Sequence, residues 1–230
     1  MNTILSIPIA LNREEIRTQL AIRAGTKAEA TLERILNGVD ALARPKAIYR
    51  VSYVEDRGTD TVAVEDTIFH SATMRRNLEE VGRIFPFIVT CGTEVENTPI
   101  DSDDAVQRTW LSMIELALLR QAMETLRNTI QEEYQLDHLS VMNPGSAEAG
   151  VWPIEEQRPL FDLFGGPEVV EQAIGVRLLP SYFMTPGMSA SGILFPSETT
   201  YINCQLCQRQ DCPSRKAPFD AVLWQSIQTS

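Results

Sequence analysis

A helical stretch near the middle of the chain constrains the fold more than any other segment. From Asp101 to Tyr134 the sequence reads DSDDAVQRTWLSMIELALLRQAMETLRNTIQEEY. Acidic residues gather where its first turn would lie, a position that the helix dipole favours. The part from Trp110 to Leu119 is apolar nearly all round, so it predicts a central helix that is buried by a sheet or by other helices.

Two helices are predicted before the first strands. Asn12 is a suitable N-cap for a helix that runs to about Arg23, and Thr26 is a suitable N-cap for a second helix. The second helix carries apolar residues along one face, namely Leu32, Ile35, Leu36, Val39 and Leu42. We therefore expect a helical hairpin over about residues 1–44.

After Pro45 the pattern changes to strands. Residues 47–54 and 61–69 predict a β-hairpin, with a turn through Asp56, Arg57 and Gly58. Ser71 is expected to cap a helix whose apolar residues are Met74, Leu78, Val81 and Ile84. The apolar run FPFIVTCG, residues 85–92, then predicts a buried strand.

The C-terminal half is expected to contain short elements. Residues 138–146 predict a strand that runs into a Pro-Gly turn. A helix should begin near Pro153, be interrupted early by Pro159 and end before residues 165–166, and a second short helix should span about 167–173. Residues 175–186 and 190–195 predict paired strands around a turn at 186–187.

This order of elements favours an α+β fold, with an antiparallel sheet and helices packed on it, over a regular alternation of strand and helix. The chain has 230 residues, of which 43% are hydrophobic, enough for a proper core. No internal repeat or low-complexity linker divides it. We therefore predict a single domain over residues 1–230.

The charge excludes several classes of partner. The net charge is −11 and the isoelectric point is about 4.7, so neither nucleic acid nor an anionic membrane is an expected partner. No apolar run reaches about 18 residues, and the N-terminal segment lacks a basic leader. We expect a cytoplasmic protein whose four cysteines are reduced or bound to a metal, because a chain of this size does not need disulfides.

A cysteine loop is expected over about residues 201–216. Cys204, Cys207 and Cys212 have the spacing C-x2-C-x4-C, and Cys91 is the only candidate for a fourth thiolate. Two cysteines separated by two residues can turn around one metal ion or one cluster iron. The sequence therefore predicts an Fe-S or zinc centre, while a redox dithiol and plain free thiols stay open as alternatives.

Three segments of the sequence resemble the activation domain of cobalamin-dependent methionine synthase. VMNPGS, residues 141–146, with the following WPIEEQ run is similar to the family's R-x-x-P-G-Y loop and the short helix after it. IGVRLLPSYFMTPGMSASG, residues 174–192, is similar to the family's I-G-x-x-L-T-E-S-x-x-M-x-P-x-x-S-V-S-G segment. Tyr201 occupies the place of a family tyrosine near the S-adenosylmethionine site.

The resemblance implies a C-shaped α+β domain that binds S-adenosylmethionine and presents it to a corrinoid protein. The cofactor-binding positions that it implies are Pro144, Gly145, Ser146, Glu124, Ser189, Ser191 and Tyr201. The implied partners are a corrinoid protein or corrinoid-dependent methyltransferase, which carries the cobalamin, and a reductase or flavodoxin-type electron donor. No catalytic side chain is expected, because such a site mainly positions two ligands.

Two functions follow as hypotheses. The first is a stand-alone reactivation factor for a corrinoid protein, taking part in its reductive methylation, with a cysteine-ligated Fe-S or metal centre. The second is a zinc-stabilised interaction protein of the same fold that has lost S-adenosylmethionine binding. Val141 and Ser146 support the second hypothesis, because the family has an arginine and a tyrosine at these positions.

Overall fold

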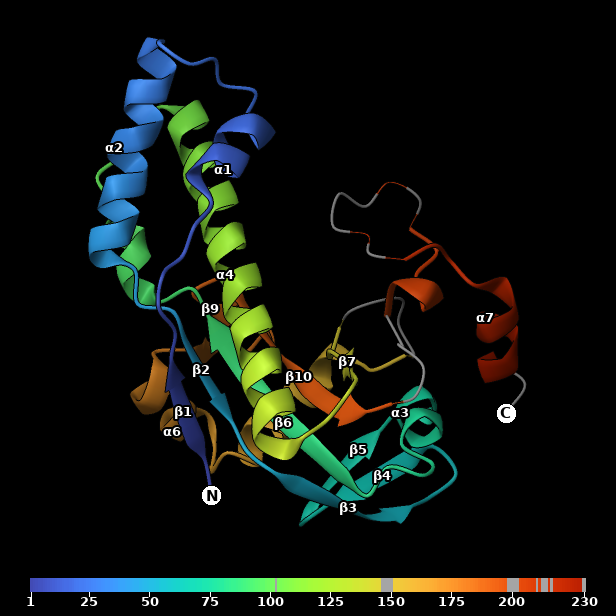
Figure 1. Cartoon of the computed structure of the whole chain (residues 1–230). Helices are drawn as coiled ribbons and strands as arrows, with labels where there is room; N and C mark the ends of the chain where they lie inside the picture. Colours follow the sequence, from blue (N-terminus) through green and yellow to red (C-terminus); the bar gives the residue numbers. More distant parts are fainter. Residues whose placement is uncertain are drawn as a thin grey trace.

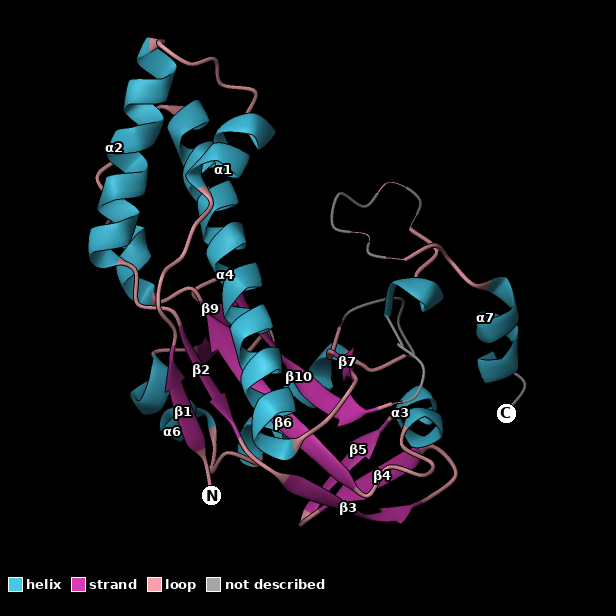
Figure 2. Ribbon diagram, in the orientation of Figure 1, coloured by secondary structure: helices cyan, strands magenta, loops and turns pink. Residues whose placement is uncertain are grey.

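A strongly curled antiparallel sheet forms the base of the molecule, and a column of helices rises from one side of it (Figures 1 and 2). The computed structural model describes residues 1–101, 103–145, 151–197, 203–209, 211, 215 and 217–228. Together with the C-terminal helix, which lies across from the helical column, these elements give the open, C-like outline seen in Figure 1.

Eight described strands make up the main sheet. They are β1 (Thr3–Ser6), β2 (Lys46–Tyr49), β3 (Ser52–Arg57), β4 (Thr61–Val64), β5 (Thr67–His70), β6 (Arg83–Thr90), β7 (Leu139–Met142) and β10 (Ser189–Pro196). The long strand β6 is the organising element, since it pairs with β2, β3 and β10, and β10 in turn pairs with β7. A separate two-stranded ribbon joins β8 (Arg177–Leu178) to β9 (Met184–Thr185).

Helices cover both faces of this sheet. The helix α4 (Ala105–Tyr134) crosses one face and packs Ala122, Leu126 and Ile130 against alternate residues of β6 and β10. The opposite face is covered by α5 (Gln157–Asp162) and α6 (Pro167–Ile174), which enclose Ile48 and Ile88. Because successive side chains of a strand point to opposite faces, each strand residue can be assigned to the α4 side or to the α5 side.

The helical column contains α1 (Arg13–Gln19), α2 (Lys27–Leu42) and the N-terminal half of α4. The remaining helices are α3 (Ala72–Asn77), the 3-10 turns η1 (Thr93–Asn97), η2 (Ile154–Glu156) and η3 (Asn203–Leu206), and α7 (Ala221–Gln228). None of the helices in the described ranges is long and apolar enough to span a bilayer.

The local signals for helix starts are confirmed. The side chains of Asn12, Thr26 and Ser71 each accept a hydrogen bond from the backbone N–H three residues later, at 3.1, 3.3 and 2.9 Å. Such a cap contributes about 1 kcal/mol, because it satisfies a donor that the first turn leaves unpaired. The buried strand over residues 85–92 is confirmed as part of β6.

Several expectations about the N-terminal half are wrong in detail. The predicted hairpin is present, since β3 and β4 pair antiparallel, but its two segments form four strands. The first segment is interrupted at residues 50–51 while it continues along β6, and the second turns at Glu65, which has a positive φ of 51°. The helix after Ser71 ends at Asn77, and Ile84 lies in β6. The first helix ends at Gln19 rather than at Arg23.

The expected central helix is confirmed, since α4 packs on the sheet and against α2, but it is buried along one face only and Met113 in its apolar stretch is exposed. Two expectations about the later segments are wrong. Pro159 does not interrupt its helix, because it lies in the first turn of α5, where a missing N–H costs nothing. The ribbon segment 175–186 does not pair with β10 but folds on itself as β8 and β9, while β10 joins the main sheet.

Candidate functional site

The Pro-Gly turn predicted after the strand of residues 138–146 is present at the end of β7. Gly145 has a φ of +69°, and a Cβ there would lie 2.5 Å from Ile154 Cδ1, so only glycine fits without a shift. Its N–H donates to Trp152 O at 2.8 Å, and Asn143 Nδ2 donates to Ser191 O at 2.7 Å. The turn is therefore fixed both to the segment that follows it and to β10. Ser146 lies outside the described residues.

Trp152 lies under this turn, and the buried N–H group of its indole ring is unusual. The residue is 2% exposed and packs edge-to-face on Phe69 with ring centroids 5.7 Å apart. Its indole N–H is buried and has no hydrogen-bond partner in the structure. A buried donor without a partner is uncommon, because leaving it unpaired costs about 1–3 kcal/mol.

Two charged residues of α4 lie on the side of the helix that meets β7. Arg127 is half-buried and donates to Leu139 O at 3.1 Å. Burial lowers the pKa of its guanidinium from the ordinary value, and the charge of Glu124 partly opposes that effect. Glu124 itself is exposed to solvent. Glu124, which the family resemblance implies as a cofactor-binding position, therefore presents a carboxylate beside the strand that leads into the Pro-Gly turn.

Ser189 and Ser191, in contrast, belong to the other side of the sheet. Ser191 is 3% exposed, and its hydroxyl donates to Gln157 Oε1 of α5 at 2.7 Å. The Ser189 hydroxyl bonds Pro186 O at 2.8 Å and Thr90 Oγ1 at 3.1 Å. Because α5 and α4 cover opposite faces, the structure does not bring these serines together with Glu124.

The small residues of β10 are explained by the close approach of the neighbouring strand β7. A Cβ on Gly192 would lie 2.1 Å from Met142 O, so the glycine allows β7 to approach β10 closely. The small residues at 189–192, which the resemblance linked to ligand contact, are therefore explained in part by tight strand packing.

Cys91 lies apart from the cysteine loop. It is fully buried among residues of the helical column, and its Sγ contacts Gly92 O at 3.7 Å. Burial, reinforced by the negative charge of Glu115, raises the pKa of its thiol to about 12. A thiol in this environment is a small core group and is strongly disfavoured as a thiolate.

Two further cysteines lie at the C-terminal 3-10 turn. Cys204 and Cys207 are half-buried at η3, while Cys212 and Tyr201 lie outside the described residues. Within the described ranges, no three His, Cys, Asp or Glu side chains come close enough together to hold a metal ion. Cys91, Cys204 and Cys207 therefore do not form one site, and a metal centre that includes Cys212 stays a prediction from the sequence.

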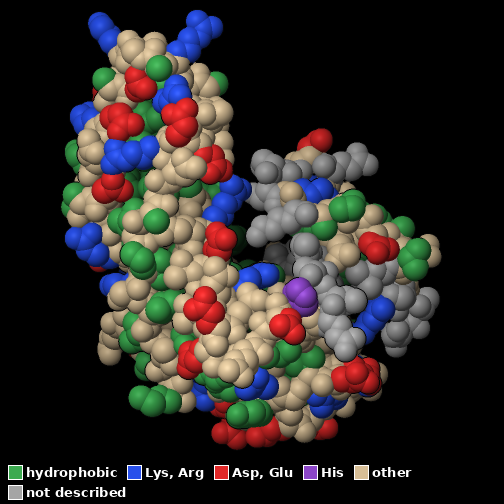
Figure 3. Space-filling view, in the orientation of Figure 1, with side chains coloured by type: hydrophobic (Ala, Val, Ile, Leu, Met, Phe, Trp, Pro, Cys, Tyr) green, Lys and Arg blue, Asp and Glu red, His purple; other side chains and the backbone are tan. Residues whose placement is uncertain are grey.

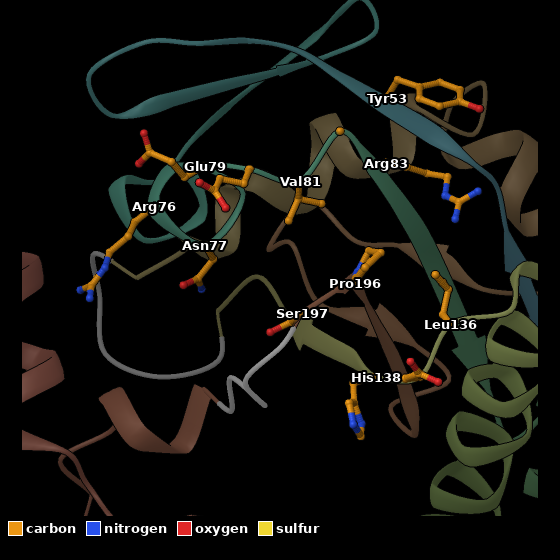
Figure 4. A pocket seen from close by; sticks show the side chains of 13 residues that line it. Tyr53, Arg76, Asn77, Glu79, Val81, Arg83, Leu136, His138, Pro196 and Ser197 are labelled. Atoms are coloured by element: carbon orange, nitrogen blue, oxygen red, sulfur yellow. The ribbon is translucent and has the colours of Figure 1, made fainter.

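A pocket opens at the opposite end of β7 (Figure 4). It was not predicted from the sequence. Its volume is about 1080 Å³, and four separate segments line it, including Tyr53, Asn77, Arg83, His138 and Pro196. The Arg83 guanidinium lies 5.5 Å from the Phe85 ring centroid and 5.2 Å from that of Tyr134. No local motif could have indicated this pocket, because its walls come from residues far apart in the chain.

The surface is also hollowed beside the helical column (Figure 3). The Pro-Gly turn follows β7 directly, and Leu206 of η3 packs in the same core cluster as Met142 of β7 and Trp152. The end of β7 and the turn η3 are therefore joined through one core cluster.

No family model and no curated protein matches this sequence. Among solved structures, the MetH reactivation domain bound to AdoHcy is similar, with a TM-score of 0.58 and 15% sequence identity. The similarity covers 88% of this chain and 81% of that one. It confirms the α+β fold with a curled antiparallel sheet that the sequence predicted.

Proposed function

We propose that this protein is a reactivation module that binds S-adenosylmethionine, or its demethylated product, and docks onto a corrinoid protein. The observation that carries the proposal is the similarity, over most of both chains, to a reactivation domain solved with bound AdoHcy. The resemblance of the Pro-Gly loop and of the ribbon segment to the same family supports this assignment, because it depends on the sequence and not on the fold.

The residues around the Pro-Gly turn fit an adenosyl ligand in two respects. Glu124 offers an exposed carboxylate beside β7, which suits the positive sulfur and ammonium of S-adenosylmethionine. Gly145 carries no side chain, so backbone groups of the turn can meet a ligand closely. When bound, S-adenosylmethionine supplies a methyl group on a positively charged sulfur.

One feature limits which part of the ligand this chain can hold. Val141 packs into the apolar cluster beneath α4, so its position supplies no cation for the ligand carboxylate. The nearby cation Arg127 already donates to Leu139 O. The proposed role of the site is therefore to position the adenosyl and sulfonium parts through backbone and carboxylate contacts, with no side chain transferring a proton.

Titration calorimetry of the full chain tests this proposal. We expect both S-adenosylmethionine and S-adenosylhomocysteine to bind. Glu124→Gln should lower the affinity for S-adenosylmethionine by about two- to fivefold, because only this ligand carries the sulfonium charge. Glu171→Gln is the matched control, since Glu171 is exposed on α6 across the sheet. It should leave both affinities unchanged.

A folded protein that binds neither ligand would contradict the proposal. That result would favour an interaction protein of the same fold that has lost S-adenosylmethionine binding, the function that Val141 already supports. The docking part is tested separately by mixing the chain with a corrinoid protein loaded with hydroxocobalamin and measuring the mass of any complex by light scattering. Complex formation without ligand binding would retain the docking role alone.

An electron donor of the reductase or flavodoxin type and a metal at the cysteine loop remain finer parts of the same proposal. Iron, zinc and acid-labile sulfide should be measured on anaerobically purified protein. Iron with sulfide would support an electron relay, whereas zinc alone would support a structural centre.

A further inference from the structure

The 3-10 turn η3 presents two cysteines with a defined spacing. The N–H of Cys207 donates to Cys204 O at 3.2 Å, which closes a turn of the i to i+3 type. Side chains three residues apart eclipse each other in such a turn, and their Cα atoms are separated by about 6 Å. Disulfides bridge Cα atoms about 4.4–6.8 Å apart, so the Cα spacing expected for this turn lies within the range of a disulfide.

Leu206 fixes the orientation of this turn. It is fully buried in the core cluster that contains Met142, Trp152 and Phe195, and Trp224 of α7 packs against the same cluster. Cys204 and Cys207 flank this anchor and are only partly buried. The turn therefore holds an apolar side chain in the core while both cysteines are partly exposed.

Arg215 comes later in the chain and stabilises the same turn by direct contact. Its guanidinium donates to Cys204 O at 3.1 Å, to Cys207 O at 3.0 Å and to Ala217 O at 3.1 Å, and it also contacts Arg209 O. One planar cation thus bonds the carbonyl groups of both cysteines. Such multiple bonding restricts the backbone of the turn that carries both cysteines.

We propose that Cys204 and Cys207 form a redox-active dithiol that converts reversibly to an intramolecular disulfide. This dithiol is the alternative to a metal centre at the cysteine loop, because two sulfurs that are joined in a disulfide are not available as thiolate ligands. It does not depend on the proposed adenosyl site. The co-reactant is a low-molecular-weight disulfide such as oxidised glutathione.

The reaction balances as a thiol–disulfide exchange. One cysteine sulfur, as the thiolate, attacks a sulfur of the glutathione disulfide, forms a mixed disulfide and releases one glutathione thiol. The second cysteine sulfur then attacks the mixed disulfide, forms the Cys204–Cys207 bond and releases the second glutathione thiol. The protein loses two electrons and two protons, and the oxidised glutathione gains them.

Closing this disulfide has a structural consequence. The bond would fix the turn that carries Leu206, and Leu206 packs beside Trp152 under the Pro-Gly turn. Oxidation therefore acts on the segment that packs beside Trp152, while the buried Cys91 takes no part in it.

The test is equilibration of the full, reduced chain with mixtures of reduced and oxidised glutathione, followed by acid quenching and intact-mass and peptide analysis. We expect a product that lacks two hydrogen atoms, with the bond mapped to Cys204 and Cys207. Cys204→Ser and Cys207→Ser should each abolish this product. Arg215→Ala should shift the equilibrium toward the dithiol by about tenfold, because two bonds that hold the turn are lost.

The matched control is Arg209→Ala, since Arg209 contributes its carbonyl group and its side chain is exposed. It should leave the equilibrium unchanged. Three results would overturn the proposal: a stable glutathione adduct on one cysteine, a disulfide that uses Cys212, or thiols that stay unreactive until a chelator removes zinc or iron. None of these results bears on adenosyl-ligand binding, so the two proposals can fail independently.

Discussion

Replacing Leu206 by alanine is expected to release the C-terminal segment from the core. Leu206 is 0% exposed and packs with Met142, Trp152 and Phe195. Truncating a fully buried leucine to alanine costs about 2–5 kcal/mol, because both apolar burial and packing are lost. We expect a value near the lower end, about 2–3 kcal/mol, since the segment lies at the surface and can partly collapse into the space.

Hydrogen exchange measured by mass spectrometry gives the readout for this variant. A loss of about 2–3 kcal/mol corresponds to roughly 30- to 150-fold faster exchange of residues 203–209, while β6 and β10 should keep their protection. Val222→Ala is the control, because Val222 is 79% exposed and its truncation should change nothing. Equal exchange of this segment in Leu206→Ala and in the parent protein would refute the idea that Leu206 anchors it.

Four further results are expected. Gly192→Ala should destabilise the protein by about 2–3 kcal/mol in urea unfolding, because its Cβ would lie 2.1 Å from a carbonyl oxygen of β7. Ser191→Ala should cost about 1–3 kcal/mol, since it leaves the buried Gln157 amide without its donor, and it should not change adenosyl-ligand affinity. Cys91 should resist iodoacetamide at pH 8 until the protein is unfolded, because burial raises the pKa of its thiol to about 12. Burial, with the charge of Glu96, also raises the pKa of the Glu115 carboxyl, so the free energy of unfolding should fall as pH rises above about 4.5, and Glu115→Gln should remove that part of the pH dependence.

Much of the fold follows from short-range signals in the sequence. The caps at Asn12, Thr26 and Ser71 and the apolar run of β6 depend on neighbouring residues, and all of them are found in the structure. The division between β2 and β3 could not be predicted in this way. It lies at Arg50, whose guanidinium bonds Glu65 at 2.7 and 2.9 Å and also contacts Leu163 O, both distant in the chain.

The candidate site was predictable only where it is local. The Pro-Gly turn after β7 could be predicted because its glycine and proline are adjacent to the strand that they end. The side of the sheet that Ser191 faces could not, since it depends on which helices cover β10. The distance between Cys91 and the cysteine loop is likewise set by tertiary packing, and spacing along the chain carries no information about it.

The central claim is that an adenosyl ligand binds at the Pro-Gly turn beside α4. Hydrogen exchange of the full chain with and without S-adenosylhomocysteine tests it most directly, because it reports both whether the ligand binds and where. We predict slower exchange in residues 139–145 and 151–157 and around Glu124, with no change in α6 across the sheet. Unchanged exchange throughout at saturating ligand, or protection confined to the pocket around Arg83 and His138, would contradict the account.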